Sequence, residues 1–321
     1  MKLTFEQICS ITSGAVSVEQ KPDGIHFYKC TKEQIEAWTR LSTTLGERAA
    51  TTTGVCLDFH TNSKHLAFSI VGENKFELYI DGLLRHQFRS DTKSTFSAEL
   101  CDTLGNEQSE YRVTLVLPSH SAGILQELTL DDGATVEPHR YDRKMLFIGD
   151  SITQGWNAQY DSLSYAWRVS RHFNADSIIQ GIGGAYYHES TFDTLPFDPD
   201  VVLVAYGTND FGHYSSLEEL RGHVSAYLSL IKQEYASKQI FVLSPIWRGH
   251  RDGKKMGNFE DCRTVIIQEA ERLGMIHING LRLVPPFPSL FADEYLHPND
   301  EGFSIYAENL IVELEKHLQI N

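Results

Sequence analysis

The pattern of apolar residues changes once along this chain, near residue 144, and that change limits what the chain can fold into. Before it, short runs alternate between apolar and polar residues, as in 65–70 and 111–116, with turn sequences such as Asp81-Gly82 between them. An alternation of period two is typical of half-buried strands, and many such strands joined by turns favour an antiparallel β-sandwich. Residues 32–41 predict one helix that interrupts these strands.

After residue 144, apolar runs of strand length alternate with helical patterns. Strands are predicted at residues 145–148, 177–180, 201–205, 239–243 and 275–278, and helices at 164–173, 217–235, 258–273 and at the end of the chain. Buried strands separated by amphipathic helices indicate a parallel sheet with helices on both faces. We therefore predict a jelly-roll-like β-sandwich domain over residues 1–138 and a three-layer α/β/α domain over residues 139–321.

The charge and composition of the chain argue against several classes of protein. It has 28 Lys and Arg against 43 Asp and Glu, a net charge of −15, and no basic patch, so we expect no nucleic-acid partner. Its apolar runs are far shorter than the ~20 residues of a membrane span, so no membrane partner is expected. Residues 1–7 lack the apolar region of a secretory signal, and the five cysteines show no Cys-x-x-Cys spacing, which favours a cytoplasmic location.

A serine stands where the first strand of the α/β part ends, in the sequence Gly149-Asp150-Ser151-Ile152. In open parallel sheets, ligands bind beyond the carboxyl ends of the strands, so Ser151 has a position suited to an active site. The same residues could also form an ordinary helix cap. A serine hydroxyl is a poor nucleophile unless a base lies within hydrogen-bond reach.

A histidine near the end of the chain could be that base. Residues 293–299 (DEYLHPN) place Asp293 and Glu294 four and three residues before His297, and Pro298 predicts that a helix begins just after the histidine. A carboxylate that accepts from Nδ1 of His297 would leave Nε2 facing a serine. The alternative is that this segment is only a helix-entry sequence.

Two more turns follow strands and could supply hydrogen-bond donors. Residues 181–184 (GIGG) can bring a backbone N–H close to a ligand, and residues 207–210 (GTND) present a side-chain amide. The tetrahedral intermediate of acyl transfer needs donors around its oxyanion, and the N–H groups of Ser151 and Gly184 with the amide of Asn209 would supply three. Taken singly, the glycines could form a tight turn and Asn209 an Asx-turn.

Together these segments resemble the SGNH hydrolases, also called GDSL esterases and lipases, whose four motif blocks occur here in order at residues 149–152, 181–184, 207–210 and 297–299. The resemblance covers roughly residues 144–318 and implies the flavodoxin-like α/β/α fold of that family. It also implies that Ser151 is the nucleophile, Gly184 and Asn209 are oxyanion-hole donors, and His297 is the general base. No catalytic group is expected from the first domain.

The acid that orients His297 departs from the family pattern. The family usually has an aspartate three residues before the histidine, where this chain has Glu294, with Asp293 one residue further back. Spacing favours Glu294, and Asp293 is the alternative. In some members of the family a backbone carbonyl orients the histidine, which is the third possibility here.

Aromatic and polar residues are mixed in the segments predicted to rim the site. Tyr186, Trp247 and Arg248 are the candidate substrate-binding residues, because such a mixture suits a sugar ring better than an acyl chain. Each could equally serve ordinary packing. A sandwich ahead of an SGNH domain also resembles carbohydrate esterases that remove acetyl groups. The resemblance therefore implies an esterase for small acyl esters, with an acetylated small molecule or oligosaccharide as its partner.

Two other functions fit the same sequence. An acyltransferase would form the same acyl-enzyme and pass the acyl group to a hydroxylated acceptor, and an inactive relative would only bind carbohydrate. The chain has no His-Glu-x-x-His, no phosphate-binding loop and no complete dinucleotide fingerprint, so we expect neither a metal nor another cofactor. A homo-oligomer is compatible with the sequence.

Overall fold

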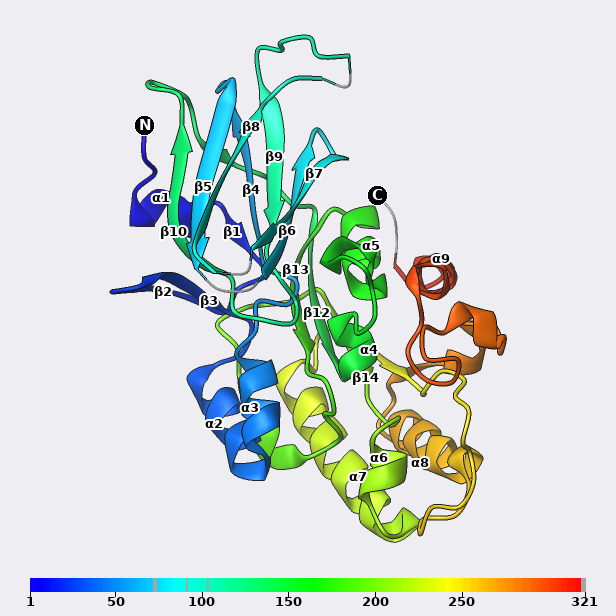
Figure 1. Cartoon of the computed structure of the whole chain (residues 1–321). Helices are drawn as coiled ribbons and strands as arrows, with labels where there is room; N and C mark the ends of the chain where they lie inside the picture. The colour runs from blue at the N-terminus through cyan, green and yellow to red at the C-terminus, as the bar shows by residue number, and fades with distance from the viewer. Residues whose placement is uncertain (72–73, 91, 103, 319–321) are drawn as a thin grey trace. The chain divides into compact units, whose positions relative to one another are not determined.

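The computed structural model describes the chain apart from residues 72–73, 91, 103 and 319–321, and Figure 1 follows it from end to end. It contains two compact units, each built from several segments. The first unit comprises Met1–Cys30, Ala50–Tyr141 and Tyr160–Ser162, and the second comprises Thr31–Ala49, Asp142–Gln159 and Leu163–Asn321. A single boundary between residues 138 and 139 does not describe this division, because residues 31–49 fold with the second unit and residues 160–162 with the first.

Two antiparallel sheets form most of the first unit, which also contains the short helix α1 (Phe5–Ser10). In one sheet the strand order is β1 (Thr12–Ser13), β4 (Cys56–Thr61), β9 (Tyr111–Val116), β6 (Asn74–Ile80) and β7 (Leu83–Ser90), and β11 (Glu137–Pro138) pairs with β4. In the other the order is β2 (Ser17–Lys21), β3 (Gly24–Tyr28), β10 (Ile124–Leu130), β5 (His65–Val71) and β8 (Ser94–Glu99). The predicted β-sandwich is confirmed.

One apolar core serves both sheets of this sandwich. Every second residue of the inner strands is apolar and buried, so both sheets contribute to the same cluster, which includes Phe27, Phe59, Phe68, Leu78, Val113 and Leu128. The alternation seen in the sequence is therefore the pattern of one face turned to this core.

Five parallel strands form the sheet of the second unit. Their order is β13 (Ala175–Gly181), β12 (Arg143–Gly149), β14 (Val201–Ala205), β15 (Gln239–Leu243) and β16 (Ile276–Ile278). Numbered along the chain this is 2-1-3-4-5, the flavodoxin-like order, which confirms the predicted α/β/α fold. The order reverses between β12 and β14, and ligands bind at this switch point in open α/β sheets.

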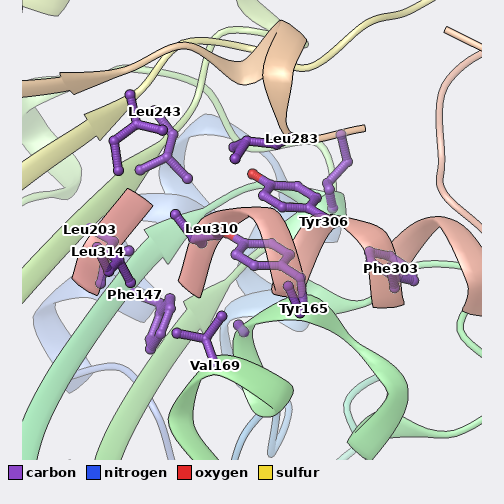
Figure 2. Close-up of a cluster of buried hydrophobic side chains, with 14 of the residues drawn as sticks. Phe147, Tyr165, Val169, Leu203, Leu243, Leu283, Phe303, Tyr306, Leu310 and Leu314 are labelled. Atoms are coloured by element: carbon purple, nitrogen blue, oxygen red, sulfur yellow. The ribbon is translucent and has the colours of Figure 1, made fainter. Parts of the chain in front are cut away.

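Helices cover both faces of this sheet. On one face, α5 (Tyr165–His172) and α9 (Asp300–Glu315) pack on each other and on alternate strand residues such as Phe147 and Leu203, and Figure 2 shows this cluster. Within it, Tyr165 stacks on Tyr306 with 4.0 Å between ring centroids. On the other face lie α7 (Leu217–Glu234) and α8 (Phe259–Arg272), which also pack on each other.

A helical hairpin near the start of the chain belongs to the second unit. It consists of α2 (Lys32–Leu41), which the sequence predicts, and α3 (Thr43–Ala49), which it does not. Thr31 and Gln34 form a capping box that begins α2. The side-chain amides of Gln34 and Gln180, the latter in β13, exchange hydrogen bonds of 3.2 and 2.9 Å, and Thr31 Oγ1 donates to Asp193 Oδ2 at 2.6 Å. The hairpin is thus fixed to the edge strand of the parallel sheet.

Candidate active site

Ser151 begins the short helix α4 (Ser151–Gln154), directly after β12 and at the switch point of the sheet. Asp150 caps this helix, because its Oδ1 accepts from the backbone N–H of Ile152 at 2.9 Å. Burial raises the pKa of Asp150 to about 7. Asp150 therefore shapes the turn that presents Ser151.

Ser151, His297 and Asp293 lie in one line of hydrogen bonds. Ser151 Oγ is 2.9 Å from His297 Nε2, and His297 Nδ1 is 2.7 Å from Asp293 Oδ2. Because a carboxylate can only accept, Nδ1 carries the ring proton and Nε2 is left to accept from the serine hydroxyl. This is the order of groups in which a base activates a serine and an acid orients the base.

The loop that carries His297 is closed by its own backbone. Ala292 N–H donates to the His297 carbonyl at 2.8 Å, and a β-bridge joins Phe291 to Pro298. Within the loop, Asp293 Oδ1 accepts from the backbone N–H groups of Tyr295, Leu296 and His297 at 3.2, 2.8 and 3.0 Å. The Asp293 carboxylate therefore organises the loop and orients the ring at the same time.

Glu294, which spacing favours as the orienting acid, does not have that position. Its side chain is exposed and its φ is +65°, a left-handed conformation that turns the chain between Asp293 and the histidine. Spacing misleads here because the segment is a loop and α9 begins only at Asp300. The preference for Glu294 is corrected in favour of Asp293.

The charge of Asp293 is stabilised where it meets the ring. Burial raises the pKa of this carboxyl, but hydrogen bonds from the backbone N–H groups of His297 and Leu296 and from the His297 side chain lower it by more. The net pKa of Asp293 lies below its usual value, so the group is a carboxylate across the neutral range.

Asn209 lies after β14 and just before the short helix α6 (Asp210–His213). Its Nδ2 donates to the carbonyl of Ala185 at 2.9 Å, which ties this turn to the glycine loop after β13. An amide nitrogen carries two protons, so this bond uses one of two donors. Next to it, Asp210 is fully buried, its Oδ1 accepts from Tyr187 N–H at 3.0 Å, and burial raises its pKa to about 7.

The glycine loop after β13 requires residues without side chains. A Cβ on Gly181 would lie 2.3 Å from the backbone nitrogen of Gln154, and Gly184 has a φ of +88°. Gly183 lies between them and is held on both sides. Its N–H donates to Gln154 Oε1 at 2.8 Å, and its carbonyl accepts from Arg48 Nη1 at 2.7 Å.

Sequence reasoning missed two residues of this region, Arg48 and Trp156. The guanidinium of Arg48 lies 5.0 Å from the ring centroid of Trp156, and that ring lies 6.3 Å from the ring of His297. Trp156 follows Ser151 by five residues, so its proximity to the serine motif was a usable signal. No such signal existed for Arg48, which is about a hundred residues before the first motif.

The three candidate substrate-binding residues all make contacts within the second unit. Tyr186 is 7% exposed and stacks on His213 with 3.7 Å between centroids. Trp247 packs against Phe291 at 5.0 Å, and Arg248 Nη1 donates to the carbonyl of Thr208 at 2.7 Å. Arg248 therefore holds the turn that carries Asn209. Binding of substrate by these three residues stays a prediction.

The part of the chain that the structure describes contains neither a candidate metal site nor a disulfide. No three His, Cys, Asp or Glu residues among those described are placed to hold a metal ion, and the five cysteines are free thiols. No described helix has both the length and the apolarity needed to cross a bilayer.

Solved structures share the fold over nearly the whole chain. A salicylyl-acyltransferase, SsfX3, from a tetracycline biosynthetic pathway has a TM-score of 0.83 and 20% identity, with 97% of this chain and 96% of that chain covered. A family two carbohydrate esterase from Clostridium thermocellum, in complex with cellohexaose, has a TM-score of 0.70 and 17% identity, covering 95% and 98%. An acetyl xylan esterase from the rumen bacterium Butyrivibrio proteoclasticus has a TM-score of 0.58 and 15% identity, with 82% of this chain and 90% of that chain covered.

No functionally curated protein matches the sequence significantly. Residues 147–305, however, match the model of the GDSL-like lipase/acylhydrolase family. The matched range begins within β12 and ends within α9, so it spans the switch point, both donor turns and the loop of His297. The second unit of this chain therefore contains a domain of the GDSL-like lipase/acylhydrolase family.

Proposed function

We propose that the protein is a serine esterase that removes small acyl groups, chiefly acetyl, from a saccharide through an acyl-enzyme on Ser151. The observation that carries this proposal is the line of hydrogen bonds from Asp293 through His297 to Ser151, at 2.7 and 2.9 Å. A serine so placed can lose its proton to Nε2 as it attacks a carbonyl carbon.

The proposed reaction has two halves, acylation and deacylation, and each passes through a tetrahedral intermediate. In the first, Ser151 Oγ bonds to the ester carbon while its proton passes to His297, and the bond to the alcohol then breaks as the alcohol oxygen takes that proton. In the second, water attacks the acyl carbon and gives a proton to His297. The bond from that carbon to Ser151 Oγ then breaks, Oγ takes the proton from His297, and the acid leaves. Asp293 stays ionised throughout and stabilises the imidazolium.

The oxyanion formed in each half needs donors fixed in advance. We assign this role to the backbone N–H groups of Ser151 and Gly184 and to the amide of Asn209. The bond from Asn209 to Ala185 brings the amide next to the glycine loop, which supports their acting at one oxygen. Each such donor contributes in the transition state, where the charge is greatest, more than in the bound ester.

The acyl group and the alcohol are inferred from relatives and from the aromatic residues. The solved structures with this fold include proteins named as family two carbohydrate esterases and as an acetyl xylan esterase. Trp156 beside His297 and the exposed ring of His213, which stacks on the buried Tyr186, are flat rings of the kind that sugar rings pack on. An acetylated oligosaccharide fits both observations.

Acyl transfer is the second candidate, and one specific observation favours it. The structure with a TM-score of 0.83 is named as an acyltransferase. Such an enzyme would use the same acyl-enzyme and differ only in whether water or a hydroxylated acceptor attacks it. The choice is made in the second half of the reaction, so it does not alter the assignments above.

Steady-state kinetics with p-nitrophenyl esters of rising chain length test the proposal. We expect turnover of the acetyl ester that falls with chain length and is abolished by Ser151→Ala. Release of acetate from acetylated xylan or cello-oligosaccharides tests the saccharide, and mass spectrometry after addition of alcohol acceptors separates transfer from hydrolysis. Wild-type protein without Ser151-dependent turnover of any ester would leave a binding protein as the remaining function.

A further inference from the structure

We propose that Arg48, from the hairpin of α2 and α3, is a positioning residue that fixes the Gly183–Gly184 peptide and thereby aims the Gly184 N–H at the oxyanion. The inference rests on the proposed esterase function and adds a residue from outside the matched family region, residues 147–305.

The geometry of one peptide unit carries the inference. The carbonyl of Gly183 and the N–H of Gly184 belong to the same planar trans peptide, so the two groups point in opposite directions. Arg48 Nη1 donates to that carbonyl at 2.7 Å. Holding the carbonyl toward Arg48 therefore also sets the direction of the Gly184 N–H.

Two consecutive glycines give this peptide little resistance to rotation. Neither residue has a Cβ, and Gly184 already lies in the left-handed region with a φ of +88°. The preceding peptide is held separately, since Gly183 N–H donates to Gln154 Oε1 at 2.8 Å. Arg48 fixes the Gly183–Gly184 peptide through a hydrogen bond that the charge of the guanidinium strengthens.

Arg48 is itself held in place from both ends. Its guanidinium lies over the Trp156 ring at 5.0 Å, and its helix is joined to α2, which the reciprocal amides of Gln34 and Gln180 fix to β13. A Cβ on Gly184 would meet Arg48 Nη1 at 3.3 Å and Leu45 at 3.4 Å, so α3 lies against the loop itself. The hairpin is thus fixed within the second unit and holds Arg48 against the glycine loop.

A hydrogen bond to the carbonyl does more than orient the peptide. It polarises the amide, so the N–H at the other end of the same peptide becomes a stronger donor. An oxyanion-hole donor works because it is oriented before the charge develops. We therefore expect Arg48 to contribute to kcat and only weakly to KM.

Arg48→Met tests this proposal, because methionine keeps an apolar stem and loses the donor. With p-nitrophenyl acetate we expect kcat to fall about 10- to 100-fold, with KM little changed, since a loosened donor costs less than the 10²- to 10³-fold of a deleted one. Arg48→Lys, which keeps a donor and a charge, should recover part of the loss, and added guanidinium should partly rescue Arg48→Met. Arg40→Met is the matched control, as Arg40 is exposed on α2, and it should behave as wild type.

A crystal structure of Arg48→Met gives a readout that does not depend on turnover. We expect the Gly183–Gly184 peptide to rotate or to adopt more than one orientation. A wild-type peptide orientation in Arg48→Met, or a kcat equal to that of Arg40→Met, would overturn the proposal. If wild-type protein lacks Ser151-dependent turnover, the esterase function fails, and the peptide orientation alone then decides the role of Arg48. If Arg48→Met does not fold, Arg48→Lys is measured in the same two ways.

Discussion

The two carboxylate oxygens of Asp293 hold His297 at two places. Oδ2 lies 2.7 Å from the ring Nδ1, and Oδ1 accepts from the backbone N–H of the same residue at 3.0 Å. A single carboxylate thus fixes both the position of the histidine in the loop and the tautomer of its ring. The orienting acid is therefore part of the loop geometry, and its removal should affect more than the charge beside the imidazole.

The first prediction separates the two acids. Asp293→Asn should lower kcat by about 10²- to 10⁴-fold, because the amide can present its NH₂ group to Nδ1 and so favour the wrong tautomer. Glu294→Gln is the matched control and should remain close to wild type, because Glu294 is exposed. Steady-state kinetics on the acetyl ester measure both. A larger loss in Glu294→Gln would reverse the assignment.

The second prediction concerns pH. The pKa of Asp293 lies below its usual value of 3.8, so the carboxylate and its stabilising contacts persist above that range and are lost only as the pH falls through the lowered pKa. The difference in the free energy of unfolding between wild type and Asp293→Asn should therefore be constant near neutral pH and shrink as the pH falls through the lowered pKa of Asp293. Urea unfolding of both proteins at a series of pH values measures this difference. A difference that does not change with pH would mean that the charge of Asp293 does not stabilise the loop.

The fold could be predicted because its signals are local. Residues 201–205 and 239–243 are apolar runs of strand length, and β14 and β15 have the same bounds. β7 was missed, since most of its residues are exposed or only partly buried and no alternation marks it. The sequence could not predict that residues 31–49 fold with the second unit, because this depends on tertiary contacts such as that between Gln34 and Gln180.

Short motifs also predict some residues of the candidate site, while others depend on loop geometry or on tertiary contacts. Ser151, Asn209 and His297 stand in short motifs at strand ends or before a helix, so their proximity follows from the topology of the sheet. The choice between Asp293 and Glu294 depends on a left-handed residue inside a loop, which spacing does not reveal. Arg48 reaches the glycine loop from a distant segment, and no pattern in the sequence joins the two.

The third prediction is that Ser151→Ala abolishes hydrolysis and leaves the fold intact. The hydroxyl forms the acyl-enzyme, while a small side chain in this turn contributes little to packing. Activity assays with circular dichroism and thermal unfolding measure the two effects. A folded Ser151→Ala protein with wild-type turnover would contradict the mechanism as a whole.

The fourth prediction concerns Asn209. Asn209→Ala should lower kcat by about 10²- to 10³-fold with a smaller change in KM, the usual cost of one oxyanion-hole donor. The bond to Ala185 is lost as well, so thermal unfolding should be measured beside the kinetics. A change confined to KM would make Asn209 a substrate-binding residue instead.

The last prediction tests whether the hairpin folds as part of the second unit. Gln34 and Gln180 are both buried and exchange two hydrogen bonds, so changing either one to leucine removes both of these bonds from the other amide. Each single variant should lower the free energy of unfolding by about 1–3 kcal/mol, the usual cost of removing the hydrogen-bond partner of a buried polar group. Gln34→Leu should cost more, because Gln34 Oε1 also accepts the backbone N–H of Thr31 at 3.0 Å. The double leucine variant should lose less than the sum of the two, since the second substitution finds both shared hydrogen bonds already removed. Urea unfolding of the four proteins measures this coupling, and strictly additive losses would mean that the two amides do not hold the hairpin to β13.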